Sequence, residues 1–255
     1  MNSSVVLIHG TNAGPWTMEN FFRYFEQEGF HCHSPSDRFH EDSSHRASER
    51  RLIGTSIADY VDDILGCVRT LDTLPILVGH SLGGVIAQQL AAMGLARGLV
   101  LLNGSVNWGI CPTTHHERSL GKKLMEAGAF WNSVLLPDFE TMATYGLNKL
   151  SLTDQHRIFN RLGPESGRVM FELFFWFFDE NKTTKIDYDR ITCPVLMISG
   201  SHDLAIPPST ARLIAERHGS KASFHEVHNF GHYLTLEPEW KTIAARCARW
   251  MKELN

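Results

Sequence analysis

The sequence predicts an α/β fold in which a mostly parallel sheet is flanked by helices. Short apolar runs rich in β-branched residues alternate along the chain with stretches whose apolar residues recur at helical spacing. Residues 105–190 interrupt this alternation, because they carry no clear strand–helix repeat and many large aromatic side chains. A length of 255 residues suits one α/β domain with an insertion better than two independent domains. We therefore expect a core of residues 1–104 and 191–255 and a helical, aromatic-rich cap of residues 105–190.

The expected core elements follow one another in strand–helix order. Before the insertion we expect strands over residues 5–8, 30–33, 76–78 and 98–102, and helices over residues 18–27, 56–71 and 85–93. After it we expect strands over residues 194–198 and 223–227 and helices over residues 208–216 and 240–254. Residues 34–51 are rich in Ser, Asp, Glu and Arg, which predicts a long exposed connection.

The most informative stretch is Pro-Ile-Leu-Val-Gly-His-Ser-Leu-Gly-Gly at residues 75–84. A buried strand leads into Ser81, which lies between two glycines, and a run of good helix formers follows it. This is the G-x-S-x-G pattern of a nucleophile elbow, in which a strained turn exposes a serine hydroxyl above the sheet. The following helix directs backbone N–H groups and its positive dipole toward the same place. Ser81 is therefore the candidate nucleophile.

A second glycine-containing loop, residues 9–16, follows the first strand. The carboxyl edge of a parallel sheet is where open α/β folds bind their ligands. The backbone N–H of Thr11 in this loop and that of Leu82, directly after the serine, are the expected donors of an oxyanion hole.

An acid and a base are expected in two later loops. Asp203 follows the strand at residues 194–198, whereas Asp187 and Asp189 precede it and are less well placed. His232 follows a glycine and precedes an apolar run, which favours it over His228 in the same loop. His80, inside the elbow, is expected to be structural.

The order Ser81, Asp203, His232 resembles that of α/β-hydrolase fold serine hydrolases. The resemblance is carried by His9-Gly10, Gly79-His-Ser-Leu-Gly83, Gly200-Ser-His-Asp203 and Gly231-His232, and it covers nearly the whole chain except the cap. Because the chain begins almost at once with its His-Gly strand, it is similar to the compact members that include plant methyl esterases and hydroxynitrile lyases. The resemblance implies a Ser-His-Asp triad, an acyl-enzyme on Ser81 and no cofactor.

The expected activity is hydrolysis of a carboxylic ester or lactone of a small, partly apolar substrate. The same triad serves thioesters and carbon–carbon bonds beside a ketone, so these remain open. A hydroxynitrile lyase, a cofactor-free oxygenase and a ligand receptor that no longer hydrolyses are the alternatives. In the lyases a lysine follows the catalytic histidine, but Tyr233 stands there in this chain, which counts against that alternative.

Composition and spacing argue against several other functions. A net charge of −4 offers no basic field for nucleic acid or an anionic membrane. No signal peptide or membrane span is recognised, and five scattered cysteines fit reduced thiols in a cytoplasmic protein. His31-Cys-His33 with Asp37, or His115-His116, are weak candidates for metal ligands, and neither a zinc helix motif nor a dinucleotide fingerprint is present. We expect two or three cap aromatics to line the pocket, while substrate identity and oligomeric state stay open.

Overall fold

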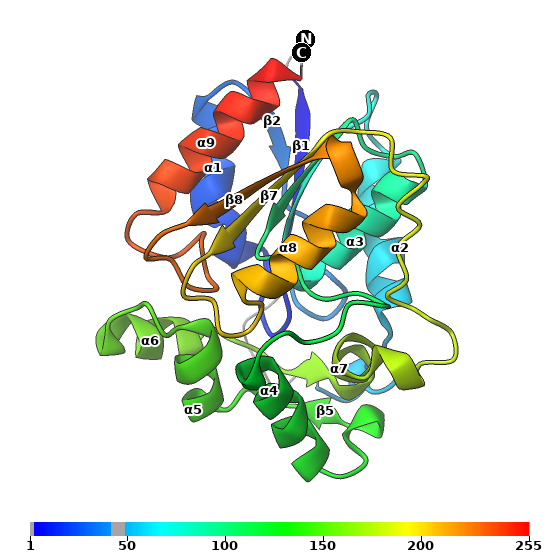
Figure 1. Ribbon diagram of the computed structural model, residues 1–255, viewed down its shortest axis with the longest axis vertical. Coiled ribbons are helices and arrows are strands. Elements are labelled where there is room, and N and C mark those ends of the chain that lie inside the picture. Colours follow the sequence, from blue (N-terminus) through cyan, green and yellow to red (C-terminus); the bar gives the residue numbers. More distant parts are fainter. Residues whose placement is uncertain (1–2, 42–48, 255) are drawn as a thin grey trace.

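The computed structural model describes residues 3–41 and 49–254. Within them, six strands form one sheet in the order β2-β1-β3-β4-β7-β8, and every pairing of neighbours in it is parallel (Figure 1). The strands are β1 (Ser4–Ile8), β2 (His31–His33), β3 (Ile76–His80), β4 (Gly98–Leu102), β7 (Val195–Gly200) and β8 (Ala222–Val227). The fold class predicted from the sequence is confirmed.

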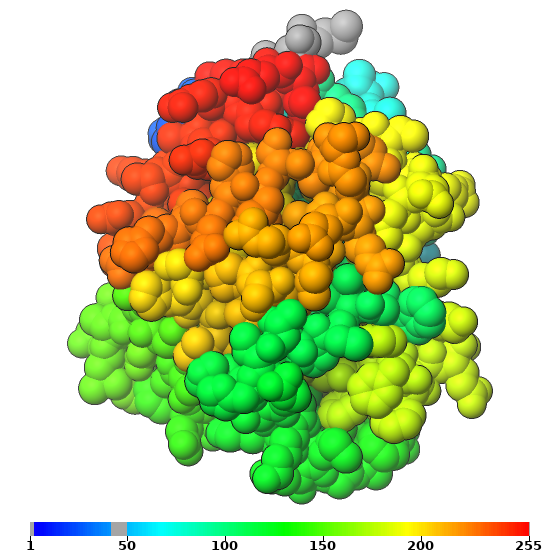
Figure 2. All heavy atoms as spheres, in the orientation of Figure 1, coloured from blue at the N-terminus to red at the C-terminus, as the bar shows by residue number. Residues whose placement is uncertain are grey.

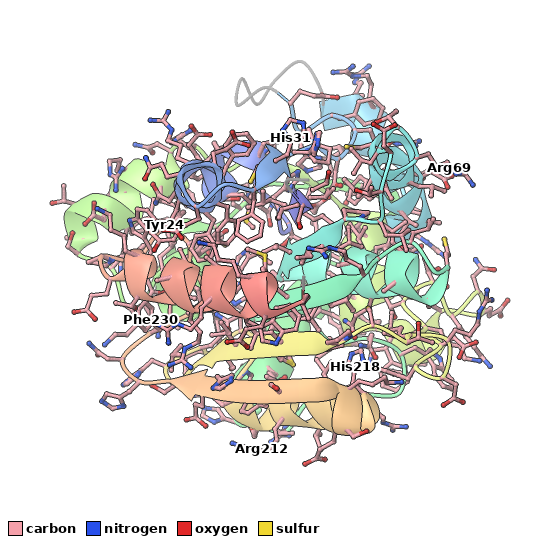
Figure 3. The ribbon with its side chains drawn as sticks, turned by 90° about the horizontal axis from the view of Figure 1, so that it is seen from above. Tyr24, His31, Arg69, Arg212, His218 and Phe230 are labelled. Atoms are coloured by element: carbon pink, nitrogen blue, oxygen red, sulfur yellow. The ribbon has the colours of Figure 1, made fainter. Side chains whose placement is uncertain are left out.

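Helices cover both faces of the sheet (Figures 1 and 3). One face packs against α1 (Glu19–Gln27) and α9 (Trp240–Glu253), and the other against α2 (Ile57–Val68), α3 (Leu82–Ala92) and α8 (Pro208–Arg217). Successive strand residues point to opposite faces, so Val5 and Leu7 join the first layer while Val6 and Ile8 join the second. Both layers bury apolar residues, which explains why the strands are apolar without alternation.

The strand order reverses between β1 and β3. From β1 the chain passes outward to β2, and from β3 it passes in the opposite direction through β4 to β8. Ile8 pairs with Gly79, so the two strands end side by side. Parallel sheets bind ligands at such a switch point, outside the carboxyl ends of the strands.

Residues 105–190 lie across this end of the sheet, and the space-filling view shows their atoms packed against the core (Figures 1 and 2). Their helices are α4 (His115–Glu126), α5 (Phe139–Thr141), α6 (Leu152–Phe159) and α7 (Gly167–Phe174). They also form a small antiparallel ribbon of β5 (Val134–Leu135) and β6 (Glu165–Ser166). Strands of two residues are too short to produce a period in the sequence, which is why helices alone were expected. The boundaries at residues 105 and 190 stay a prediction.

Helix α7 of this segment supplies a capping group to a helix of the sheet layer. The Glu172 carboxylate accepts hydrogen bonds from the backbone N–H of Ile57 (2.8 Å) and from the Ser56 hydroxyl (2.9 Å), both at the start of α2. Arg168 donates to the same carboxylate at 2.7 Å. A carboxylate at a helix N-terminus is favoured by unsatisfied N–H groups and the helix dipole.

The expected exposed connection over residues 34–51 is wrong in part. Asp37 and His40 are buried, because the chain turns inward there and places both side chains beside the loop after β1. Residues 42–48 lie outside the described residues, and the connection ends in a 3₁₀ turn, Glu49–Leu52. In the two described stretches, every helix falls short of the length and hydropathy needed to cross a membrane.

Candidate active site

Ser81 occupies a strained turn between β3 and α3. Its backbone angles are φ 51° and ψ −121°, outside the regions that a non-glycine residue ordinarily adopts. The turn is held by hydrogen bonds: Ser81 N–H donates to Leu102 O (3.1 Å), and Ser81 O accepts from Gly84 N–H (2.8 Å) and Ser105 N–H (2.9 Å). The end of β4 therefore fixes the elbow in place.

Glycines around Ser81 allow backbones to approach closely. A Cβ at Gly79 would lie 2.3 Å from Gly83 O, and a Cβ at Gly83 would lie 2.3 Å from Ile8 O. A Cβ at Gly10 would lie 2.9 Å from Ser81 Cβ. Any larger residue at these positions would push apart strand, helix and loop, so the glycines bring the loop after β1 against the serine.

His232 and Asp203 meet beside this elbow. His232 Nδ1 lies 2.8 Å from Asp203 Oδ2, and both side chains are buried. The second oxygen, Asp203 Oδ1, accepts from the backbone N–H groups of Ala205 and Ile206, each at 2.8 Å. The carboxylate thus has donors for both oxygens and fixes the proton on His232 Nδ1.

The rival acids and base lie elsewhere. Asp187 and Asp189 are exposed and precede β7. His228 is exposed, and its ring faces His202 with a centroid separation of 6.0 Å. The structure therefore brings His232 and Asp203 together and leaves the alternatives on the surface.

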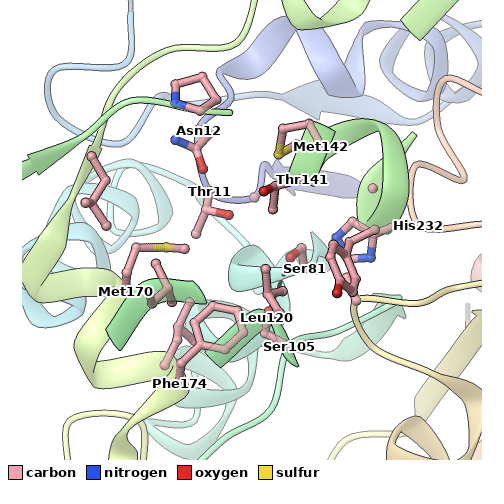
Figure 4. Close-up of a pocket in the computed structure, with 18 of the residues that line it drawn as sticks. Thr11, Asn12, Ser81, Ser105, Leu120, Thr141, Met142, Met170, Phe174 and His232 are labelled. Atoms are coloured by element: carbon pink, nitrogen blue, oxygen red, sulfur yellow. Dashed lines mark hydrogen bonds between the residues drawn. The ribbon is translucent and has the colours of Figure 1, made fainter. Parts of the chain in front are cut away.

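The Ser81 hydroxyl points to a neighbouring hydroxyl. Ser81 Oγ lies 3.2 Å from Ser105 Oγ, and in the described residues it makes no hydrogen bond to His232. Ser81 and His232 nonetheless line the same cavity (Figure 4). Turning Ser81 to another staggered rotamer is the movement that would direct its hydroxyl toward a different partner.

Two buried side chains position the loop that carries His232. Asn103 Nδ2 donates to the carbonyls of Gly231 and His232, each at 2.8 Å, and Asn103 Oδ1 accepts from Gly200 N–H at 2.9 Å. His80 Nε2 donates to the same His232 carbonyl at 2.9 Å. Burial, with the nearby His232, lowers the pKa of His80 to about 3, so His80 is neutral. The structural role predicted for His80 agrees with these contacts, whereas no sequence pattern singled out Asn103.

Backbone N–H donors are free in the loop after β1 and at the start of α3. Thr11 lines the cavity, and Leu82 is the first residue of α3. The N–H groups of both residues have no hydrogen-bond partner among residues 3–41 and 49–254. The next N–H, that of Asn12, is already committed, because it donates to Glu165 Oε2 at 3.1 Å.

A buried polar cluster supports this loop from behind. Glu165 accepts from the Tyr60 hydroxyl at 2.7 Å and lies 3.5 Å from His40 Nε2. Burial opposes a charge on His40, but the Glu165 carboxylate outweighs it and raises the pKa of His40 to about 9. Burial likewise opposes ionisation of Glu165, yet His40 holds the pKa of Glu165 below its usual range. Next to this ion pair, burial and His40 lower the pKa of His9 to about 4, and burial raises that of Asp37.

The cavity in front of Ser81 has a volume of about 310 Å³. Its polar end carries Ser81, Ser105, Thr11 and His232, and most of the remaining wall is apolar (Figure 4). The aromatic residues in its wall are Tyr145, Phe174 and Tyr233. Such a volume, with few polar groups at one end, suits a small, partly apolar molecule.

The histidine pairs considered as metal ligands lie outside this cavity. His31 and His33 contact one another on β2, with ring centroids 4.7 Å apart, and His115 and His116 do so at the start of α4, at 3.9 Å. Among the described residues no group of three or more His, Cys, Asp or Glu side chains is arranged to hold a metal ion.

A parallel sheet with a strained serine between strand and helix, at the switch point, defines the α/β-hydrolase class. A model of the alpha/beta hydrolase family matches residues 5–244, and the chain belongs to that family. No curated protein sequence matches the chain significantly.

Solved structures of similar fold cover almost the whole chain. Monoacylglycerol lipase of Paleococcus ferrophilus is 20% identical, with a TM-score of 0.71, over 100% of this chain and 97% of that one. A polyneuridine aldehyde esterase mutant is 17% identical, with a TM-score of 0.73, over 98% and 99% of the two chains. A mutant of tomato methylketone synthase I is 14% identical, with a TM-score of 0.75, over 100% of both. At these identities the likeness concerns the fold.

Proposed function

We propose that this protein is a serine hydrolase that cleaves a carboxylic ester or lactone bond of a small, partly apolar substrate. The observation that carries the proposal is that His232, which is paired with Asp203, lines one cavity together with the strained Ser81. The lipase and esterase among the structures of similar fold support the same chemistry.

Each side chain has a role in the proposed reaction. Ser81 Oγ attacks the carbonyl carbon while His232 Nε2 takes the hydroxyl proton, and Asp203 holds the imidazole and stabilises its positive charge. The N–H groups of Thr11 and Leu82 stabilise the oxyanion that forms. His232 then returns the proton to the leaving oxygen, and a water molecule activated by the same base hydrolyses the acyl-enzyme.

Ser105 contacts Ser81 but takes no chemical step in the proposed reaction. Before the attack, the Ser81 hydroxyl must turn from Ser105 Oγ to His232. Hydrogen bonds of a catalytic base are often absent or long before substrate binds, so this orientation is compatible with the proposed role.

The first test is the turnover of nitrophenyl esters of different acyl length and of several lactones. We expect Ser81→Ala to lower kcat by roughly 10⁴- to 10⁶-fold while its circular dichroism spectrum stays that of the wild type. Ser105→Ala is the matched control, because it removes the neighbouring hydroxyl and leaves the nucleophile in place. Mass spectrometry of enzyme trapped with a slow ester should find the acyl group on Ser81.

Two results would overturn the proposal. Full activity of Ser81→Ala would exclude this serine as the nucleophile. A wild-type protein that turns over no ester or lactone would favour a lyase, an oxygenase or a ligand receptor built on the same cavity.

A further inference from the structure

A second cavity lies next to the first. Its volume is about 220 Å³, and its wall includes Val106, Phe175, Trp176 and Phe177. Four residues line both cavities, and they form the partition between them: Leu173, Phe174, Ala205 and Ile206. The two cavities are therefore separated by the thickness of single side chains.

Helix α4 lies between the two cavities. The residues that it contributes to the first cavity are Leu120, Lys123 and Leu124, joined by Ala127 directly after the helix, and those that it contributes to the second are Glu117, Arg118, Gly121, Lys122 and Met125. Residues three or four positions apart share a helix face, so each set forms one stripe along α4. One short helix thus forms a wall of both spaces.

Phe174 is the aromatic side chain of the partition, and it stands apart from the neighbouring ring cluster. Phe171 and Phe175 stack on each other with ring centroids 6.1 Å apart, and Phe175 also contacts Phe130. Phe174 makes no ring contact in the part of the chain that the structure describes, and it is half-buried between the two spaces. Because Phe174 lines both spaces, a change of its rotamer would alter the shape of both.

The second cavity runs from this partition to the surface. Leu173 and Ile206 at its inner end are buried, whereas Met125 and Phe177 at its outer end are 61% and 58% exposed. Arg118 and Lys122 are exposed at the same outer end. The wall also carries the buried Glu117, whose Oε2 accepts hydrogen bonds from Thr113 N–H (2.9 Å) and from the Thr210 hydroxyl (2.9 Å). The rest of the inner wall is hydrocarbon and the other charges lie at the opening, which suits an apolar chain whose end approaches water.

We propose that the second cavity is a subsite of the same site and holds the outer part of a long, unbranched hydrocarbon chain, which passes beside Phe174. The inference rests on the proposed ester hydrolysis at Ser81, and it names the substrate class as esters with a long alkyl chain. Acyl and alcohol portions share this chemistry, so two ester series distinguish them: nitrophenyl esters of rising acyl length and acetates of rising alkyl length.

Gly121 allows the second cavity to be filled selectively. A Cβ at Gly121 would meet no atom within 4 Å outside its helix, so Gly121→Leu places a side chain into the open space of this cavity. Gly66 in α2 is the matched control, since a Cβ there also meets nothing and it lies outside both cavities. Both changes replace a helical glycine, so the gain in helix propensity is the same.

The readout is the ratio of kcat/KM for the dodecanoate ester to that for the butyrate ester. Each methylene that enters an apolar cavity should raise kcat/KM roughly fourfold. We expect Gly121→Leu to lower the ratio by roughly tenfold or more, because several methylenes lose their place, and Gly66→Leu to keep the wild-type ratio. If the acetate series responds instead, the alcohol portion occupies the subsite.

The outcomes separate this inference from the proposed function. Turnover with an unchanged ratio in both series of Gly121→Leu, or an equal fall in Gly66→Leu, overturns the subsite and leaves the hydrolase standing. If wild type turns over no ester, the hydrocarbon subsite is tested by binding instead. Calorimetry then measures the affinity of Ser81→Ala for methyl dodecanoate and for methyl butyrate. Adding Gly121→Leu to Ser81→Ala should weaken binding of methyl dodecanoate and leave that of methyl butyrate unchanged. An equal affinity for methyl dodecanoate in the single and double variants would refute the subsite.

Discussion

Asp203 divides its two oxygens between two tasks. Oδ2 accepts the Nδ1–H of His232, and Oδ1 accepts two backbone N–H groups of its own loop. The loop bonds hold the carboxylate in place, so the direction of the His232 ring depends on the residues that follow Asp203 along the chain. A change of the Asp203 side chain should therefore alter the orientation and tautomer of the His232 imidazole more than the stability of the fold.

Asp203→Asn should lower kcat roughly 10⁴-fold with little effect on stability. If the amide oxygen keeps its bonds to Ala205 and Ile206, the NH₂ group faces His232 Nδ1 and forces the proton onto Nε2, the wrong tautomer for a base. Steady-state kinetics on the best ester provides the measurement. Asp187→Asn, at an exposed aspartate before β7, serves as control, and a loss of the same size there would contradict the assignment.

Asn103 links three backbone segments through one amide, at a φ of 45°. Asn103→Ala should destabilise the protein by about 2–3 kcal/mol, since the buried Gly231 carbonyl and Gly200 N–H lose this partner and the His232 carbonyl keeps only the bond from His80. It should also lower kcat by up to roughly 10²-fold through displacement of His232. Urea unfolding and kinetics measure the two effects.

Asn229→Ala is the matched control for Asn103. Asn229 also has a positive φ, 65°, but it lies exposed in the loop before His232. Both alanine variants replace an asparagine at positive φ, and Asn229→Ala removes only the exposed hydrogen bond that Asn229 Oδ1 accepts from Lys149 Nζ (2.6 Å), so a larger loss in Asn103→Ala reports the buried hydrogen bonds. Equal losses in the two variants would show that the amide of Asn103 does not position the base.

At the scale of elements, the strand β6 connects residues 105–190 to the loop after β1. Glu165 on this strand accepts Asn12 N–H, and Gly163 N–H donates to Asn12 O at 2.8 Å. Asn12 follows the proposed oxyanion donor Thr11, so residues 105–190 and the proposed reaction centre contact the same stretch of backbone. The charge on this junction depends on pH, because His40 faces Glu165, Asp37, His9 and Tyr60.

The His40–Glu165 pair should make stability fall at alkaline pH. The pKa of His40 is about 9 in the folded protein against 6.5 for the ordinary side chain. A raised folded pKa gives stability that is complete below pH 6.5 and is lost as pH rises through 9, roughly 3 kcal/mol in all. Urea unfolding at a series of pH values measures it.

His40→Gln should remove this alkaline loss, because glutamine does not titrate. His31→Gln, at an exposed position on β2, should keep the wild-type profile. A wild-type profile that stays flat between pH 6.5 and 9, or an unchanged loss in His40→Gln, would show that the pair is not ionised as described.

At the scale of the whole molecule, two helical layers bury the sheet and most of the cysteines. Cys32, Cys193 and Cys247 are buried, Cys67 is half-buried and Cys111 is exposed, and all five are free thiols. Burial raises the pKa of Cys247 to about 12, and burial together with Glu26 does the same for Cys32. A thiol reacts as its thiolate, so burial should slow the reaction of a cysteine in two ways, by blocking access to the sulfur and by raising its pKa.

The native protein should therefore show one fast thiol. We expect Cys111 to react at once with a chromogenic disulfide at neutral pH, Cys67 slowly, and the three buried cysteines only after unfolding in urea. Cys111→Ser should abolish the fast phase. Prompt reaction of more than two thiols in the folded protein would contradict the packing of the two layers.

The sequence by itself determined the α/β class, the order of the core elements and the proposed nucleophile, acid and base. Apolar runs, helical periods and the glycines Gly79, Gly83 and Gly10 reflect what a strand, a helix or a tight turn requires of neighbouring residues. They can therefore be recognised without knowing the tertiary contacts. Element boundaries were less certain: α3 begins at Leu82 rather than at residue 85, because helix propensity does not reveal the strained turn.

Only the tertiary structure decided what depends on residues far apart in the chain. The roles of Asn103 and Glu165, the burial of Asp37 and His40, and the pairing of β5 with β6 each require partners dozens of positions away or more. The same holds for the two cavities, whose shared partition combines α7 with the loop after Asp203. Polar residues in a loop look solvent-exposed in sequence, and only the folded contacts show which of them are buried and paired.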